Sequence, residues 1–97
     1  MSDVLGVIIR CDHTRELLYK TDEALLSVLQ RAVGGYIERI KLSRSKTKDY
    51  FPEEGYNLLI VNEEGIPLEL PVNEIITEIL GYEVRGSVVA MLSRKFK

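Results

Sequence analysis

The sequence has no tryptophan and only one cysteine and one histidine among its 97 residues. A single cysteine cannot form an internal disulfide, so an oxidising compartment would add nothing to stability. The apolar run at residues 4–9 is far shorter than the roughly 20 residues that a membrane-spanning helix needs. The first residues, Met1-Ser2-Asp3, carry no basic signal region. We therefore expect a cytoplasmic protein that does not enter a membrane.

An excess of one charge is also lacking, since 13 lysines and arginines stand against 15 aspartates and glutamates. A formal net charge of −2 argues against a uniformly basic protein that coats nucleic acid, although a local basic patch stays open. Hydrophobic residues make up 45% of the chain, which is too much for a disordered protein. The length is that of one ordinary domain, and we expect a single domain over residues 1–97.

The strongest apolar segments are typical of buried strands, and they lie at residues 4–9, 57–61 and 84–92. Their apolar runs are nearly continuous, which indicates strands buried on both faces near the middle of a sheet. Weaker strands are expected at residues 16–20, 36–42 and 66–70. Pro67 lacks an amide donor, so the segment around it belongs on a sheet edge.

Two helices are indicated by apolar residues that recur at three- and four-residue steps. The first is expected over residues 22–33, where Thr21 caps the start and Gly34 ends the helix in a left-handed conformation. The second is shorter, with Asn73 as its cap and Gly81 as its end. These elements predict an α+β fold in which two helices pack on one face of a mostly antiparallel sheet.

Strand order stays undetermined at this point. The short connections after residues 9 and 61 favour hairpins and therefore antiparallel pairs. The helical crossover between residues 4–9 and 36–42 would also permit one parallel pair.

Several short motifs follow one another along the chain, namely Val33-Gly34-Gly35-Tyr36-Ile37-Glu38, Asn62-Glu63-Glu64-Gly65, Leu70-Pro71-Val72-Asn73 and Arg85-Gly86-Ser87-Val88-Val89. In this order the chain resembles a family of small, uncharacterised domains found in phages and mobile elements. The resemblance implies a viral or plasmid-borne origin and supplies no catalytic chemistry. Residues 11–13 and the charged loop at residues 43–55 depart from the family's pattern.

Glu38 is the most informative polar residue, because it lies in the apolar row of its predicted strand. A carboxylate there must find hydrogen-bond donors, from a ligand or from a nearby backbone amide, or else become protonated. A β-bulge or an edge position that lets the carboxylate reach water is the alternative. Together with the polar residues of the motifs, a ligand or partner site is expected at Glu38, Asn62, Glu63, Glu64 and Asn73.

A second candidate surface is the basic half of the charged loop, with Lys41, Arg44, Lys46 and Lys48 followed by Tyr50 and Phe51. Positive charge beside aromatic rings is the composition that tracks a phosphate backbone and stacks a base. A second basic cluster follows at residues 94–97. The alternative is a solvated loop in which the aromatic residues are anchors.

Metal binding and catalysis find little support in the sequence. On a strand, Cys11 and His13 would share one face, but the chain has no further cysteine or histidine to complete a zinc site. No nucleophile and base of fixed spacing accompany the acidic residues. We expect no metal, no cofactor and no enzymatic activity. An enzyme built on Glu38 and Glu63 would require their carboxyl groups to converge in one cleft.

The leading hypothesis is a non-enzymatic interaction module of a virus or mobile element. It would bind a host or viral macromolecule through the loop at residues 43–55 and the turn at residues 62–65. If the protein is viral, its location is the host cytoplasm. The alternative is a protein that binds nucleic acid or a nucleotide through residues 41–51. A homodimer also stays open, because apolar helix residues in excess of the core can form a self-association surface.

Overall fold

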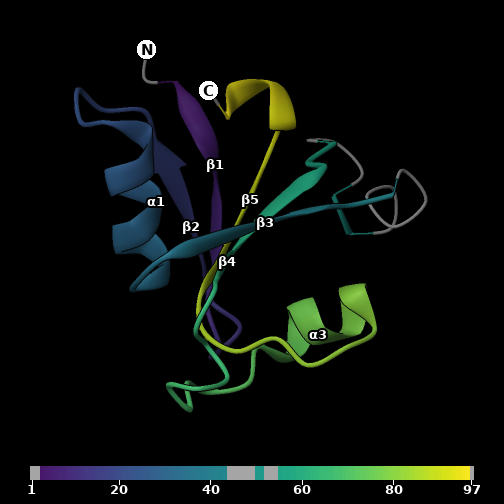
Figure 1. Ribbon diagram of the computed structural model, residues 1–97. Coiled ribbons are helices and arrows are strands. Elements are labelled where there is room, and N and C mark those ends of the chain that lie inside the picture. The colour runs from purple at the N-terminus through teal and green to yellow at the C-terminus, as the bar shows by residue number, and fades with distance from the viewer. Residues whose placement is uncertain (1–2, 44–49, 52–54, 97) are drawn as a thin grey trace.

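A computed structural model describes residues 3–43, 50–51 and 55–96. Its strands form a five-stranded sheet in the order β2-β1-β5-β4-β3, in which every neighbouring pair is antiparallel. The strands are β1 (Val4–Ile9), β2 (Arg15–Tyr19), β3 (Ile37–Lys41), β4 (Leu58–Asn62) and β5 (Val88–Met91) (Figure 1). The α+β class with an antiparallel sheet is thus confirmed. The parallel pair left open does not form, because β5 and β4 separate β1 from β3.

The main helices are α1 (Leu25–Val33) and α3 (Glu74–Leu80), and a 3-10 turn, η1 (Ser93–Lys95), follows β5. The expected start of α1 at Thr21 is wrong. The Thr21 hydroxyl accepts a hydrogen bond from the backbone of Glu23 in a local turn, and Ala24 precedes the helix instead. Gly34 ends α1 in a left-handed conformation, as expected. No helix in the described part of the chain is long and apolar enough to cross a membrane.

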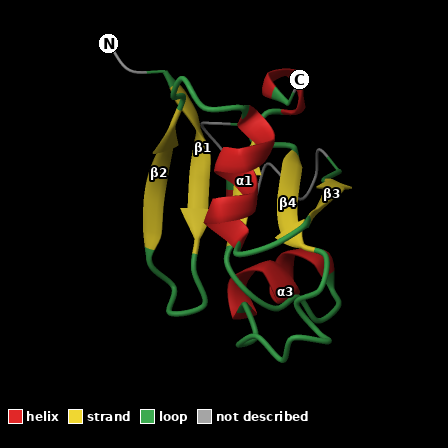
Figure 2. Cartoon of the chain, turned by 60° about the vertical axis from the view of Figure 1, so that its left-hand side comes forward, coloured by secondary structure: helices red, strands yellow, loops and turns green. Residues whose placement is uncertain are grey.

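The two helices pack against opposite faces of the sheet, which corrects the expectation that they share one face. Side chains alternate along β5, so Val89 and Met91 point to the α1 face and Val88 and Ala90 to the other. The α1 face gathers Ile8, Leu29, Val33, Leu58, Ile60, Val89 and Met91. Figure 2 shows α1 in front of the sheet and α3 at one end of it.

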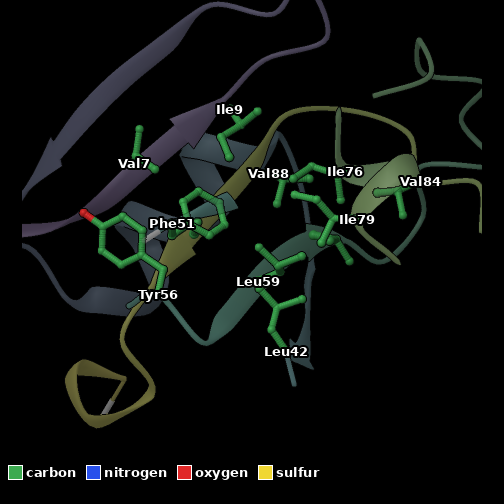
Figure 3. Close-up of a cluster of buried hydrophobic side chains, with 12 residues drawn as sticks. Val7, Ile9, Leu42, Phe51, Tyr56, Leu59, Ile76, Ile79, Val84 and Val88 are labelled. Carbon is green, nitrogen blue, oxygen red and sulfur yellow. The ribbon is translucent and has the colours of Figure 1, made fainter. Parts of the chain in front are cut away.

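The opposite face is covered by α3 and by residues from the segment between β3 and β4. Ile76 and Ile79 of α3 lie close to Leu59 and Val88, and Phe51 and Tyr56 cover a neighbouring part of the same face (Figure 3). A central strand with water on one side would alternate apolar and polar residues. The continuous apolar strands of this chain require a cover on each face, and the two helices therefore divide between the faces.

The strand expected at residues 66–70 does not form, and residues 63–69 make consecutive turns. Backbone amides bond back to nearby carbonyls here, from Leu68 to Glu64 and from Leu70 to Gly65. Pro67 has no amide to donate to a ladder. The last strand is also shorter than expected, because Gly86 has a φ of 93° and only an isolated bridge joins Val72 to Arg85. The turns at residues 63–69 stand next to residues 82–85, beside β3.

Candidate functional site

Asn73 is fully buried, and all of its side-chain polar atoms are engaged inside the protein. Its Nδ2 donates to the carbonyl oxygens of Ile9 at 2.9 Å and Gly86 at 3.0 Å. Its Oδ1 accepts from the backbone N–H of Ile76 at 3.2 Å, which is the predicted helix cap. Asn73 thereby joins β1, α3 and the segment before β5. We assign it to the scaffold, because it has no free group within reach of a ligand.

Asn62, at the end of β4, has a comparable structural role. Its side chain is 6% exposed. Its Nδ2 donates to the carbonyl of Val33 at 3.1 Å, and its Oδ1 accepts from the backbone N–H of Glu64 at 2.8 Å. Asn62 therefore fixes the end of α1 against the turn that carries Glu63 and Glu64, while its outer surface borders the groove described next.

A groove of 280 Å³ opens beside β3, on the sheet face that α3 covers. It lies between β3, the end of β4, the turns at residues 63–69 and the segment before β5. We call it the acidic groove, and its lining residues are Glu38, Ile40, Val61, Asn62, Glu63, Gly65, Ile66, Pro67, Tyr82, Glu83, Val84 and Arg85. Two of the predicted acidic residues, Glu38 and Glu63, are thus brought together, whereas Glu64 is exposed outside the lining.

The charge of this groove is mostly negative. Glu38 is exposed on edge strand β3, opposite Val61, so the edge position open to water explains its place in the apolar row. Glu83 accepts from Nε of Arg85 at 3.1 Å, and the same guanidinium donates to the Leu70 carbonyl. Within the described residues, no ion pair reaches Glu38 or Glu63. These two carboxylates are therefore available to an external cation.

Apolar side chains stand beside the carboxylates. Ile66 is 59% exposed and Tyr82 is 53% exposed, and both line the groove. Exposed large apolar side chains with polar neighbours are typical of recognition surfaces. Sequence reasoning missed both residues and Glu83. The apolar character of residues 66–70 is the one signal for Ile66, and it equally favours an edge strand.

The basic loop is only partly described, and Arg44, Lys46 and Lys48 lie outside the described residues. Phe51 is 2% exposed and packs edge-to-face on Tyr56, with ring centroids 5.5 Å apart. The guanidinium of Arg15 lies 5.9 Å from the Phe51 ring. Phe51 is therefore a core anchor that cannot stack on a base, and Tyr50 is partly buried against the same cluster.

Lys41 contributes instead to a second groove, on the α1 side of β3. This groove has a volume of 520 Å³, and its lining residues are Arg39, Lys41, Leu58, Ser93, Arg94 and Phe96. We call it the basic groove. The guanidinium of Arg39 lies 4.9 Å from the Phe96 ring, in the range of a cation–π contact. Neighbouring Lys95 points elsewhere, since its Nζ donates to the Val4 carbonyl at 2.7 Å.

Cys11 and His13 lie in the turn between β1 and β2, so no strand places them on one face. The Cys11 thiol donates to the carbonyl of Pro71 at 3.3 Å, whereas His13 Nε2 lies 3.6 Å from the Glu74 carboxylate. Across residues 3–43, 50–51 and 55–96, no three His, Cys, Asp or Glu side chains are placed so that they could hold a metal ion together.

No family model, curated protein or solved structure matches this chain. The resemblance to phage and mobile-element domains therefore stays a prediction. The function has to be argued from the two grooves themselves.

Proposed function

We propose that this protein is a non-enzymatic interaction module, and that its acidic groove binds a protein segment carrying basic and apolar side chains. One observation supports this best. Glu38 and Glu63 line the same groove, no described residue pairs with either carboxylate, and exposed Ile66 and Tyr82 also line it. The origin in a virus or mobile element and the cytoplasmic location belong to the same proposal.

The physical basis is complementary charge combined with apolar contact. A lysine or arginine placed between Glu38 and Glu63 would gain Coulomb attraction that is moderate at the surface and is screened by salt. An apolar side chain against Ile66 and Tyr82 would add about 25 cal/mol for each Å² removed from water. The charge selects the partner, and the apolar contact lengthens the lifetime of the complex.

Binding fits the groove better than catalysis does. The two carboxyl groups line one groove, as an enzyme built on them would require. Both glutamates are nevertheless exposed to water. Enzymes usually bury a carboxyl group that acts as a general acid, because burial favours its protonated form. Among the described residues, the lining contains no serine, threonine, cysteine, histidine or lysine that could serve as a nucleophile or base beside them.

The proposal is tested by fluorescence anisotropy with two labelled peptides that share leucine and tyrosine content, one rich in lysine and the other in glutamate. We expect the basic peptide to bind and the acidic one to fail. The double variant Glu38→Gln/Glu63→Gln should weaken binding about tenfold, equivalent to about 1.4 kcal/mol. Glu64→Gln is the matched control, because this carboxylate lies outside the groove, and it should bind like the wild type. Equal binding by all three proteins would contradict the proposal.

Binding of nucleic acid is the second candidate, and the basic groove is the observation that favours it. Arg39, Lys41 and Arg94 gather there next to Phe96, although the predicted aromatic residue Phe51 takes no part. Labelled single- and double-stranded oligonucleotides at two salt concentrations test this candidate. Binding that falls steeply with salt and is lost in Arg39→Ala/Lys41→Ala would support it. Absence of binding at low salt would remove it.

A further inference from the structure

The outer edge of β3 carries backbone groups that no described strand pairs. β3 is the last strand of the sheet. On its inner side, the Tyr36 carbonyl accepts from Glu63, and the Leu42 amide donates to Asn57. Inward and outward backbone groups alternate along an antiparallel strand. The N–H and C=O groups of residues 37, 39 and 41 therefore point outward, away from β4.

The two grooves lie on the two sides of this same strand. Glu38 and Ile40 point into the acidic groove, whereas Arg39 and Lys41 point into the basic groove. A chain lying along the outer edge would place alternate side chains over grooves of opposite charge. Neither groove includes a residue of β2, the other edge strand.

Resting on the proposed function, we infer that the partner segment docks as an additional antiparallel strand on the outer edge of β3. Its acidic side chains would face Arg39, Lys41 and Arg94 in the basic groove. Its basic and apolar side chains would face Glu38 and Glu63 in the acidic groove. Main-chain hydrogen bonds supply affinity in this mode of recognition, and the alternating side chains supply specificity.

A second copy of this chain is a poor occupant of the edge. If two β3 strands pair about a two-fold axis, a register centred on Arg39 sets Arg39 opposite itself. A register centred on Glu38 sets Glu38 opposite itself, and one centred on Ile40 sets Arg39 opposite Lys41. Every two-fold register that pairs three or more residues of β3 thus places like charges opposite each other, which destabilises a sheet. The charge pattern selects a different chain with alternating acidic and basic residues.

The test uses a labelled synthetic peptide of strand length in which glutamate alternates with lysine and valine. In an antiparallel pair, the residues opposite positions 37, 39 and 41 point their N–H groups at β3 and their side chains into the basic groove. These are the glutamates of the peptide. N-methylation of the glutamates should weaken binding about tenfold, because it removes the donors that face β3. N-methylation of the lysines and valine should leave binding unchanged.

A pair of protein variants makes the same comparison from the other side. Arg39→Ala removes the charge and keeps the outward N–H. Arg39→Pro removes both the charge and the outward N–H, and it breaks no hydrogen bond to β4 because this N–H points away from β4. We expect the proline variant to bind the peptide more weakly than the alanine variant. Circular dichroism checks that each variant is folded, and the methylated peptides keep the test valid if the proline variant is not.

The outcomes separate this inference from the proposed function. Equal binding of the two methylated peptides would overturn strand addition, while sensitivity to Glu38→Gln/Glu63→Gln would leave the groove proposal standing. Failure of the alternating peptide alone, with the basic peptide bound, would have the same meaning. Failure of both peptides would overturn both statements. Oligonucleotide binding lost in Arg39→Ala, without peptide binding, would assign the basic groove to nucleic acid and overturn the inference.

Discussion

Asn62 and Asn73 are buried, and the side-chain nitrogen and oxygen of each make hydrogen bonds inside the protein. Glu38 and Glu63 are instead exposed in the acidic groove and, within the described residues, form no ion pair. The difference follows from side-chain chemistry. An amide both donates and accepts, so backbone groups can satisfy it in the interior. A carboxylate only accepts and loses more hydration on burial. The two amides thus hold segments of the fold together, whereas the two carboxylates supply a surface for binding.

The largest expected effect on the buried side of this comparison comes from Asn73→Ala. The variant loses three buried hydrogen bonds and leaves the carbonyls of Ile9 and Gly86 without this donor. We expect the free energy of unfolding to fall by about 3 kcal/mol, measured by urea denaturation. Asn73→Ser keeps an acceptor for the helix cap and should recover about 1 kcal/mol. A loss below about 0.5 kcal/mol for the alanine variant would show that Asn73 does not hold these segments together.

Asn62→Ala should destabilise the protein less, by about 2 kcal/mol, because two hydrogen bonds are lost and the side chain borders the groove. Urea denaturation measures the change, with Glu63→Ala as a neighbour on the exposed side. Similar stability of the two variants would show that buried Asn62 supports the fold no more than exposed Glu63 does.

Glu38→Gln and Glu63→Gln should each change the free energy of unfolding by less than about 0.5 kcal/mol. Both side chains are exposed and form no ion pair within the described residues, so the fold does not depend on their charge. Thermal and urea denaturation check this expectation. Destabilisation by more than about 1 kcal/mol would mean that the carboxylates support the fold, and their loss could then no longer isolate binding.

The smallest effect concerns Asp12, an exposed carboxylate that does have internal donors. The Thr14 hydroxyl at 2.6 Å and the Thr14 backbone N–H hold the pKa of Asp12 below its ordinary value. The resulting stabilisation is present above the unfolded pKa and is lost as pH falls through the folded pKa. Thr14→Val should raise the Asp12 pKa, as followed by NMR titration. An unchanged pKa would show that the hydroxyl does not hold the carboxylate.

Local signals in the sequence predicted several elements correctly, and they failed at Thr21, whose hydroxyl can serve either a turn or a helix cap. Gly34 and Gly81 end α1 and α3 because glycine enters the left-handed region without a Cβ clash. The start of α1 was misplaced because a threonine hydroxyl closes a short turn as readily as it caps a helix. The distribution of helices was available from the apolar runs at β4 and β5, since strands covered on both faces require elements on both sides.

The groove could be predicted only in part. Glu38 and Glu63 stand out as acidic residues at a strand and a turn. Ile66 and Tyr82 lie beside these glutamates only because the fold brings residues 63–69 and 82–85 together next to β3. The backbone N–H of Asn73 donates to the Val84 carbonyl, and an isolated β-bridge joins Val72 to Arg85. Such contacts depend on the tertiary fold, and local periodicity carries no information about them.

An NMR titration of the isotope-labelled protein with the lysine-rich peptide locates the binding site residue by residue. If the acidic groove is that site, backbone signals around it, including those of Glu38, Glu63 and Tyr82, shift first and by the largest amounts. The Glu38→Gln/Glu63→Gln variant should need about tenfold more peptide for the same shifts, while its remaining spectrum stays native. Shifts confined to β2 or the far end of α1, or no shifts at millimolar peptide, would contradict the assignment of the acidic groove as the binding site.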